Sequence, residues 1–311
     1  MKAPGQSDRT GISLIQLFQM FPDDDAAEAF FVASRWPDGP RCPHCDSDNV
    51  QTGASHPTMP MRCRACRKRF SARTGTAMAD SKLGYRVWAI AIYLVTTNLK
   101  GVSSMKLSRD LEVTQKTAWH LAHRIRQAWT EHGDDLLAGP VEVDEAFVGG
   151  REHNRHEWQR DQDGPTPKVA VIGVKDRASG TVRARVIGQA HAPVLRGFVR
   201  EHTAPGAQLY SDGHSAYLPL DGEYAHKAVQ HSAGTYALPG GVSTNGIESF
   251  WSMLRRGEHG TYHHWSAKHL QRYVSEFAGR HNVRPLDTID QMRAVVRGLA
   301  GTRLQYRELT A

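Results

Sequence analysis

The sequence predicts an α/β protein with several folded parts, and three observations support this prediction. Two Cys-x-x-Cys pairs lie within residues 42–66, apolar residues recur at helical spacing through residues 80–131, and alternating β-branched runs begin at residue 141. The chain has 311 residues, which is more than one ordinary small domain holds. We therefore expect helices in the first half of the chain and a sheet in the second half.

The overall charge narrows the range of partners. Lys and Arg outnumber Asp and Glu, and the formal net charge is +7, which favours a polyanion such as nucleic acid. No apolar run reaches the roughly 18 residues that a membrane-spanning helix needs, and residues 1–11 lack the apolar core of a signal peptide. We therefore expect a cytoplasmic protein without a membrane partner.

Residues 1–38 are predicted to form an amino-terminal helical segment. Two short amphipathic runs, residues 12–21 and 26–33, flank the sequence Pro-Asp-Asp-Asp at 22–25. Three adjacent carboxylates could suggest a metal site. Because an Ala-rich run follows them, we interpret them as a helix N-cap and first turn.

The four cysteines have the spacing of a metal site. Cys42 and Cys45 form one pair, Cys63 and Cys66 form the other, and 17 residues separate the pairs. This spacing is typical of a zinc ribbon, in which four thiolates surround Zn²⁺ and leave no position for a substrate. Two disulfides or four unrelated thiols are the alternatives, and His44 is a possible substitute ligand. We predict a structural zinc ribbon over residues 39–76.

A basic run without any acid follows within the ribbon. On a zinc ribbon such a run favours contact with phosphates, although it could also be a solvated face. The residues that we expect to contact DNA are Arg64, Arg67, Lys68 and Arg69.

Residues 80–131 are predicted to form a helix-turn-helix region. A mostly apolar helix at 82–94 precedes helices at 103–111 and 114–129, for which Ser103 and Thr114 are good N-caps. We expect Gln115, Lys116 and Arg124 to contact DNA. The outward face of the last helix would carry polar and basic side chains: Gln115, Lys116, His120, His123, Arg124 and Arg126.

Residues 138–285 are predicted to form a separate α/β domain. Strands are expected at 141–148, 169–174, 181–187 and 207–212, with a helix near 194–201, a further segment near 227–231, and a polar loop at 151–168. Three strands, a helix and another strand suit a ribonuclease H-like sheet. The remaining residues, 286–311, form a carboxyl-terminal tail to which we assign no function.

Three acids of this domain could meet at one edge of the sheet. Asp144 lies in the first strand, Asp212 ends a later strand, and Glu248 lies in a helix with Thr244 or Asn245 as its N-cap. Neighbouring carboxylates repel unless cations lie between them, and Mg²⁺ prefers such oxygen ligands. Two ions about 4 Å apart would support in-line phosphoryl transfer.

Some alternatives remain open on the residues alone. Glu248 could simply cap its helix, because a carboxylate is stabilised in the first turn. On a regular strand Glu142 faces the same side as Asp144, and Glu145 faces the opposite side. Both are therefore rivals for the first metal ligand.

Three blocks of the sequence resemble a known family. VDEAFVGGRE, YSDGHSAY and TNGIESFWSMLRRGEHGTYHHWSAKHLQRY are similar to the DDE transposases of bacterial insertion sequences, in the group with a zinc ribbon at the front. The resemblance implies a ribonuclease H-like fold and Asp144, Asp212 and Glu248 as catalytic acids that bind two Mg²⁺ or Mn²⁺ ions. Arg255 stands where the family usually has Lys, and Asn245 is a rival third ligand.

The resemblance also implies an activity. Such enzymes bind terminal inverted repeats in double-stranded DNA, hydrolyse a phosphodiester at the element's ends and join the 3′-OH to target DNA. Pairing two ends implies a homodimer or a higher oligomer. Arg255 and Lys268 are expected to contact DNA as well. A DNA-binding regulator with an inactive domain and a nuclease without strand transfer are the alternatives.

Overall fold

The computed structural model describes residues 9–130, 135–149, 168–229 and 238–311. The chain divides into two compact units, one of residues 1–131 and 283–311, the other of residues 132–282. Both ends of the chain therefore contribute to the first unit, including the segment 286–311 that the sequence had set apart as a tail. The polar loop expected at 151–168 lies, except for its last residue, outside the described part of the chain.

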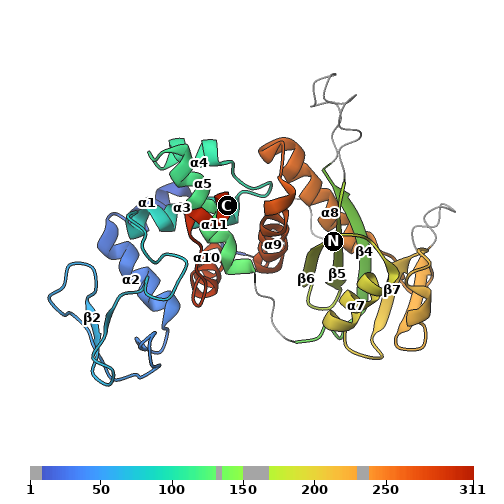
Figure 1. Ribbon diagram of the computed structural model, residues 1–311, viewed down its shortest axis with the longest axis horizontal. Helices are drawn as coiled ribbons and strands as arrows, with labels where there is room; N and C mark the ends of the chain where they lie inside the picture. Colours follow the sequence, from blue (N-terminus) through green and yellow to red (C-terminus); the bar gives the residue numbers. More distant parts are fainter. Residues whose placement is uncertain (1–8, 131–134, 150–167, 230–237) are drawn as a thin grey trace. The chain divides into compact units, whose positions relative to one another are not determined.

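The first unit is mainly helical (Figure 1). Asp23 caps the second helix by accepting the N–H of Ala26 at 2.8 Å, which confirms our interpretation of the acidic triplet. Ser103 and Thr114 cap the fourth and fifth helices as predicted. The helices are α1 (Leu14–Met20), α2 (Asp24–Arg35), α3 (Tyr85–Thr97), α4 (Ser104–Asp110), α5 (Gln115–Arg126), α10 (Thr288–Gly298) and α11 (Tyr306–Thr310).

Helix α10 completes the core of this unit. Met292, Val295 and Leu299 are buried in one cluster with residues of α2, α3 and α5. Gly298 packs so closely that any side chain there would overlap the carbonyl oxygen of Ala128. The carboxyl-terminal segment is thus part of the folded unit, because it fills a core whose other members come from the first 131 residues.

The cysteine-containing segment forms a small antiparallel sheet of three strands, β1 (Val50–Gln51), β2 (Met61–Cys63) and β3 (Arg69–Phe70), in that order. Its core is small: Met61 and Phe70 are buried beside Cys42 and Cys63. Trp36, just after α2, packs its ring against Phe70 with centroids 5.9 Å apart.

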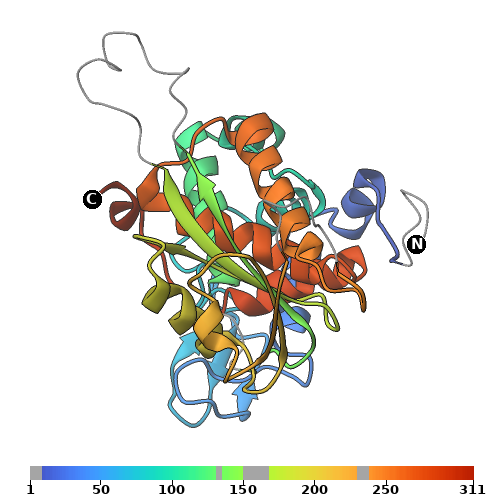
Figure 2. The same cartoon turned by 90° about the vertical axis from the view of Figure 1, so that its right-hand side faces the viewer.

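The second unit contains a mixed sheet of five strands (Figures 1 and 2). The strand order is β6-β5-β4-β7-β8, with β4 in the centre. Strands β4, β5 and β6 are antiparallel neighbours, whereas β7 and β8 run parallel to β4. The strands are β4 (Val141–Val148), β5 (Val169–Asp176), β6 (Val182–Ile187), β7 (Gln208–Asp212) and β8 (Ala225–Val229). Each strand overlaps a segment that the sequence predicted.

Helices cover both faces of this sheet. Helix α7 (Ala192–His202) packs Leu195 and Phe198 against one face. Helices α8 (Asn245–Gly257) and α9 (Ala267–Val283) pack Trp251 and Val274, among others, against the other face. In the described part of the chain, no helix is both long and apolar enough to cross a membrane.

Candidate active site and metal centre

Strand register brings the first two acids together. In the parallel pair β4–β7, Val143 is the partner of Ser211. Asp144 and Asp212 are the next residues on these neighbouring strands. Because cross-strand neighbours in a sheet lie only about 5 Å apart, the two carboxylates approach the same edge.

A buried acid on β4 fixes the start of α8. The Oε2 atom of Glu142 accepts the backbone N–H of Ile247 at 2.7 Å, and Arg177 donates to Oε1 at 2.6 Å. A side chain on Gly246 would lie only 2.7 Å from the same carboxylate, so glycine is needed for this approach. Thr244 is the N-cap residue of α8, as the sequence predicted, but its side chain makes no cap bond, and Glu142 supplies the acceptor instead.

The three predicted acids line one pocket. Its volume is about 360 Å³, and its lining residues are Asp144, Asp212, Glu248, Trp251 and Arg255. The acids come from β4, β7 and α8. Four residues that the sequence singled out thus converge, and Trp251, predicted only as part of an apolar face, joins them.

Each acid accepts a hydrogen bond from a different donor. The indole N–H of Trp251 donates to Asp144 Oδ2 at 3.1 Å, and the Thr244 hydroxyl donates to Glu248 Oε1 at 3.0 Å. The backbone N–H of His214 donates to Asp212 Oδ1 at 3.1 Å.

The electrostatics of the pocket favour a cation. Burial, together with the negative charges of Asp212, Glu145 and Glu248, raises the pKa of Asp144 to about 7. Like charges held together disfavour ionisation, and a divalent cation between them would remove this penalty. The pocket therefore offers oxygen ligands of the kind that Mg²⁺ and Mn²⁺ prefer.

Substitution of Asp144 by Asn should make stability less dependent on pH. The folded pKa of about 7 exceeds the unfolded value of 3.8, so this group destabilises the folded state increasingly as pH rises between these values. At pH 8 the cost reaches at most about 4 kcal/mol, at about 1.4 kcal/mol for each pKa unit. In thermal unfolding without divalent cations, we expect Asp144→Asn to exceed the wild type in melting temperature at pH 8, with a smaller difference at pH 5. An equal difference at both pH values would contradict this expectation.

The rival acids have other partners. Glu142 binds Arg177 and the start of α8, as described above. Glu145 accepts the Tyr217 hydroxyl at 2.7 Å on the opposite side of the strand from Glu142. Asn245 is exposed and is absent from the pocket lining. Among these candidates, Asp144 and Glu248 are the residues that face the pocket.

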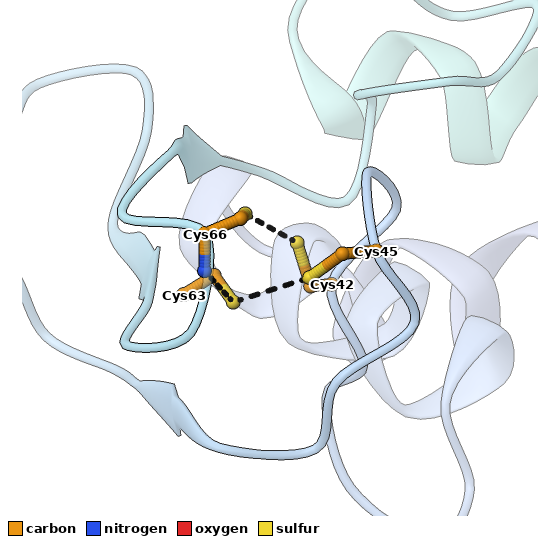
Figure 3. A group of neighbouring side chains, drawn as sticks. All are labelled: Cys42, Cys45, Cys63 and Cys66. Carbon is orange, nitrogen blue, oxygen red and sulfur yellow. Dashed lines mark hydrogen bonds between the residues drawn. The ribbon is translucent and has the colours of Figure 1, made fainter.

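The four cysteines form a compact cluster (Figure 3). The sulfur atoms of Cys42 and Cys66 are 3.6 Å apart, as are those of Cys45 and Cys63. Thiolates at about 2.3 Å from a tetrahedral Zn²⁺ ion would be about 3.8 Å from one another. The cluster therefore fits a structural zinc ion bound by four thiolates.

The backbone around the cluster supports metal binding. The N–H of Cys66 donates to Cys63 Sγ at 3.4 Å, and this bond, together with the neighbouring thiols of Cys45 and Cys66, lowers the pKa of the Cys63 thiol to about 6. The thiolate is the form that binds zinc. Asp46 and Arg67, which each follow the second cysteine of a pair, both adopt the left-handed conformation that turns the chain back. His44 is exposed and lies outside the cluster.

Both regions match known families. Residues 136–282 match the ISXO2-like transposase domain, and residues 22–69 match the transposase zinc-ribbon domain. The chain belongs to the zinc-ribbon transposases of insertion sequences. An uncharacterized protein in transposable element ISH50 of Halobacterium salinarum is 27% identical over 249 residues, which cover 76% of this chain and 83% of that protein. The transposase-domain match ends at residue 282, where the second compact unit also ends.

The zinc ribbon of the transposase carries its basic run on the surface. Five cations of this run are exposed and Arg73 at its end is half-buried, whereas Cys63 and Cys66 between them belong to the small core. The exposed residues are Arg62, Arg64, Arg67, Lys68 and Arg69. In the second unit, Arg255 and Lys268 are exposed too.

Helix α5 of the transposase exposes fewer polar and basic side chains to solvent than we expected. Gln115 and Lys116 are exposed, but His123 and Arg126 are buried, so their predicted outward orientation was wrong. His120 and Arg124 are half-buried, because the carboxyl-terminal segment covers part of the helix. The Leu304 carbonyl oxygen of this segment lies 3.3 Å from both His120 Nε2 and Arg124 Nε.

Arg124 is expected to stabilise the folded first unit. Its guanidinium also donates to the Ala79 carbonyl oxygen at 2.7 Å, so it joins α5 to two distant segments. Arg124→Met would leave two carbonyl groups without this donor, and we expect a loss of about 1–3 kcal/mol in unfolding free energy. Lys116→Met, on the exposed end of α5, is the matched variant and should cost at most about 1 kcal/mol in urea unfolding, because it loses only the contact of its ammonium group with the Tyr306 ring. Equal stability of both variants would contradict this role of Arg124.

Sequence reasoning missed the supporting residues of the pocket. Glu142 appeared as a rival ligand, although its spacing two residues before Asp144 correctly placed both on one face of β4. Trp251 appeared only as an apolar residue. Its position three residues after Glu248, on the same helical face, was the signal that could have assigned it to the pocket.

Proposed function

We propose that this transposase cleaves DNA at the ends of its element and joins the freed 3′-OH to target DNA, at the pocket formed by Asp144, Asp212 and Glu248. One observation carries this proposal. Three acids from two neighbouring strands and a helix line the same pocket as Arg255. Acids placed in this way suit the binding of divalent cations for phosphoryl transfer.

The three acids would hold two Mg²⁺ or Mn²⁺ ions, which when bound stabilise the attacking and leaving oxygens of an in-line displacement. In the first reaction water attacks the phosphorus, and the P–O bond to the 3′ oxygen breaks. In the second, the resulting 3′-OH attacks a target phosphodiester and displaces another 3′ oxygen. Neither reaction needs a covalent intermediate with the protein.

Arg255 would bind the DNA backbone at the pocket. It lies on the exposed side of α8 and belongs to the lining together with the acids. A guanidinium can form two parallel hydrogen bonds with one phosphate, which fixes its orientation. Arg255 would thus orient the scissile phosphate while the carboxylates bind the cations.

The strand arrangement supports a ribonuclease H-like catalytic domain. Three antiparallel strands are followed by two strands parallel to the first, and helices cover both faces. Two of the acids lie on the central strand β4 and its parallel neighbour β7. This arrangement agrees with the fold that the family resemblance implies.

Recognition of the element's ends would belong to the first unit. The exposed cations of the ribbon, with Gln115 and Lys116 at the start of α5, can contact phosphates and base edges. Lys268, which is exposed at the start of α9, would add a further phosphate contact. Two ends must be held at once, so we infer that the active form is a homodimer or a higher oligomer.

A strand-joining assay tests this proposal. Purified protein is incubated with Mg²⁺, a supercoiled target plasmid and labelled DNA that carries the element's own ends, either intact or already cut to expose the 3′-OH. We expect nicks on the intact DNA and joined products from both substrates. Cleavage without joining would favour a nuclease, and binding without cleavage would favour an inactive regulator.

A further inference from the structure

We propose that Trp251 is a positioning residue, whose indole N–H orients the carboxylate of Asp144 for metal binding. This inference rests on the proposed function of the pocket. It deepens that function by assigning a role to a side chain that has no metal-binding group of its own.

The contact between the two residues is direct. Trp251 Nε1 lies 3.1 Å from Asp144 Oδ2, and only 2% of the Trp251 residue surface is exposed. An indole N–H can donate but cannot accept a hydrogen bond. The bond therefore occupies Oδ2 from one direction and restricts rotation of the carboxylate.

The sheet provides a space for the indole ring. Gly173 on β5 is the cross-strand partner of Asp144, so both positions face the same side of the sheet. A Cβ atom at Gly173 would lie 2.8 and 2.9 Å from two ring carbons of Trp251, which is too close for a real contact. The missing side chain of Gly173 thus lets the ring cross β5 and reach Asp144.

Helix α8 links this contact to the third acid. Glu248 and Trp251 are three residues apart, and both line the pocket. Glu142 fixes the helix start through the N–H of Ile247. A single helix, attached to β4 at its first turn, therefore supplies one acid and orients another.

The expected effect is on metal affinity. Groups that hydrogen-bond a metal ligand orient it, and their loss commonly weakens metal binding or activity about 10–100-fold. Trp251→Phe keeps most of the aromatic packing but removes the N–H. We expect this variant to bind Mn²⁺ about 10–100-fold more weakly than the wild type, and to need correspondingly more Mn²⁺ for half-maximal DNA cleavage.

Trp265→Phe is a matched control on the same domain. The Nε1 atom of Trp265 is also buried, but among the described residues it has no hydrogen-bond partner. The same chemical change there should leave Mn²⁺ affinity unaltered. Mn²⁺ binding is measured by electron paramagnetic resonance on the full-length, zinc-loaded protein, alongside thermal unfolding.

A second pair of variants tests the position of the ring. Gly173→Ala should displace the indole and weaken Mn²⁺ binding to a similar extent, whereas Gly188→Ala, where a Cβ would meet nothing within 4 Å, should not. If Trp251→Phe and Gly173→Ala both bind Mn²⁺ as tightly as the wild type, the role of Trp251 is refuted. Asp144→Asn separates the two proposals, because unchanged Mn²⁺ binding and cleavage in that variant would refute the proposed pocket itself.

Discussion

Cys63→Ser is expected to unfold the zinc ribbon and to abolish specific binding to the element's ends. The strands of the ribbon contain only two or three residues, and its buried core consists of Met61, Phe70 and two of the cysteines. A core this small cannot stabilise a fold alone, so the free energy of zinc binding must supply the difference. Loss of Cys63 removes both a ligand and a fully buried residue of β2.

Zinc content and proteolysis measure this effect. We expect the wild type to contain one zinc ion per chain, and Cys63→Ser to contain less and to be cut by protease within residues 39–76. The second unit should remain folded. His44→Ala is the control, because His44 is exposed and lies outside the cysteine cluster. Full zinc content in Cys63→Ser would contradict the four-thiolate site.

Features with a local cause could be predicted from the sequence. The spacing of the cysteine pairs follows from the geometry of each turn, and alternating β-branched residues identified β4, β5 and β6. Asp23, Ser103 and Thr114 cap their helices because an N-cap bond joins residues only three positions apart. Such interactions do not depend on the rest of the fold.

Features that depend on distant segments could not be predicted in the same way. Helix α5 has the pattern of an exposed basic helix, but Leu304, 180 residues after Arg124, occupies part of its face. Glu142 caps α8 across 105 residues of sequence. Periodicity within one segment contains no information about which other segment will cover it, so both contacts appeared only in the folded structure.

Assigning the pocket residues required both the local sequence pattern and the contacts between distant segments. The residues identified Asp144, Asp212 and Glu248 as candidates, and strand order explains how two of them meet. The choice of Asp144 over Glu142 and Glu145 came from the family resemblance. The structure brings the chosen three to one pocket, whereas Glu142 and Glu145 bind Arg177 and Tyr217 and are absent from the pocket lining.

Asp212→Asn is expected to abolish DNA cleavage and joining while DNA binding is retained. Divalent cations at such a site stabilise the transition state by several kcal/mol, which corresponds to about a thousandfold or more in rate. The substitution removes a negative charge but keeps the shape of the side chain. The N–H of His214 can still donate to the Asn oxygen, so the local fold should persist. Asp144→Asn and Glu248→Gln should have the same effect.

Asp221→Asn is the matched control for these variants. Asp221 lies in the same unit, its side chain is 66% exposed, and it binds His226 rather than the pocket. This variant should cleave DNA at the wild-type rate. Retained DNA binding in all four variants would show that any lost cleavage reflects chemistry and not unfolding.

The most direct test of the pocket is single-turnover cleavage of labelled end DNA in Mg²⁺, measured for the wild type, Asp144→Asn, Asp212→Asn, Glu248→Gln and Asp221→Asn. We predict that the three pocket variants lose at least about a thousandfold in rate, the loss that cation stabilisation of the transition state implies, and that Asp221→Asn loses nothing. Cleavage by any of the three pocket variants at the wild-type rate would contradict the assignment of this pocket as the catalytic site.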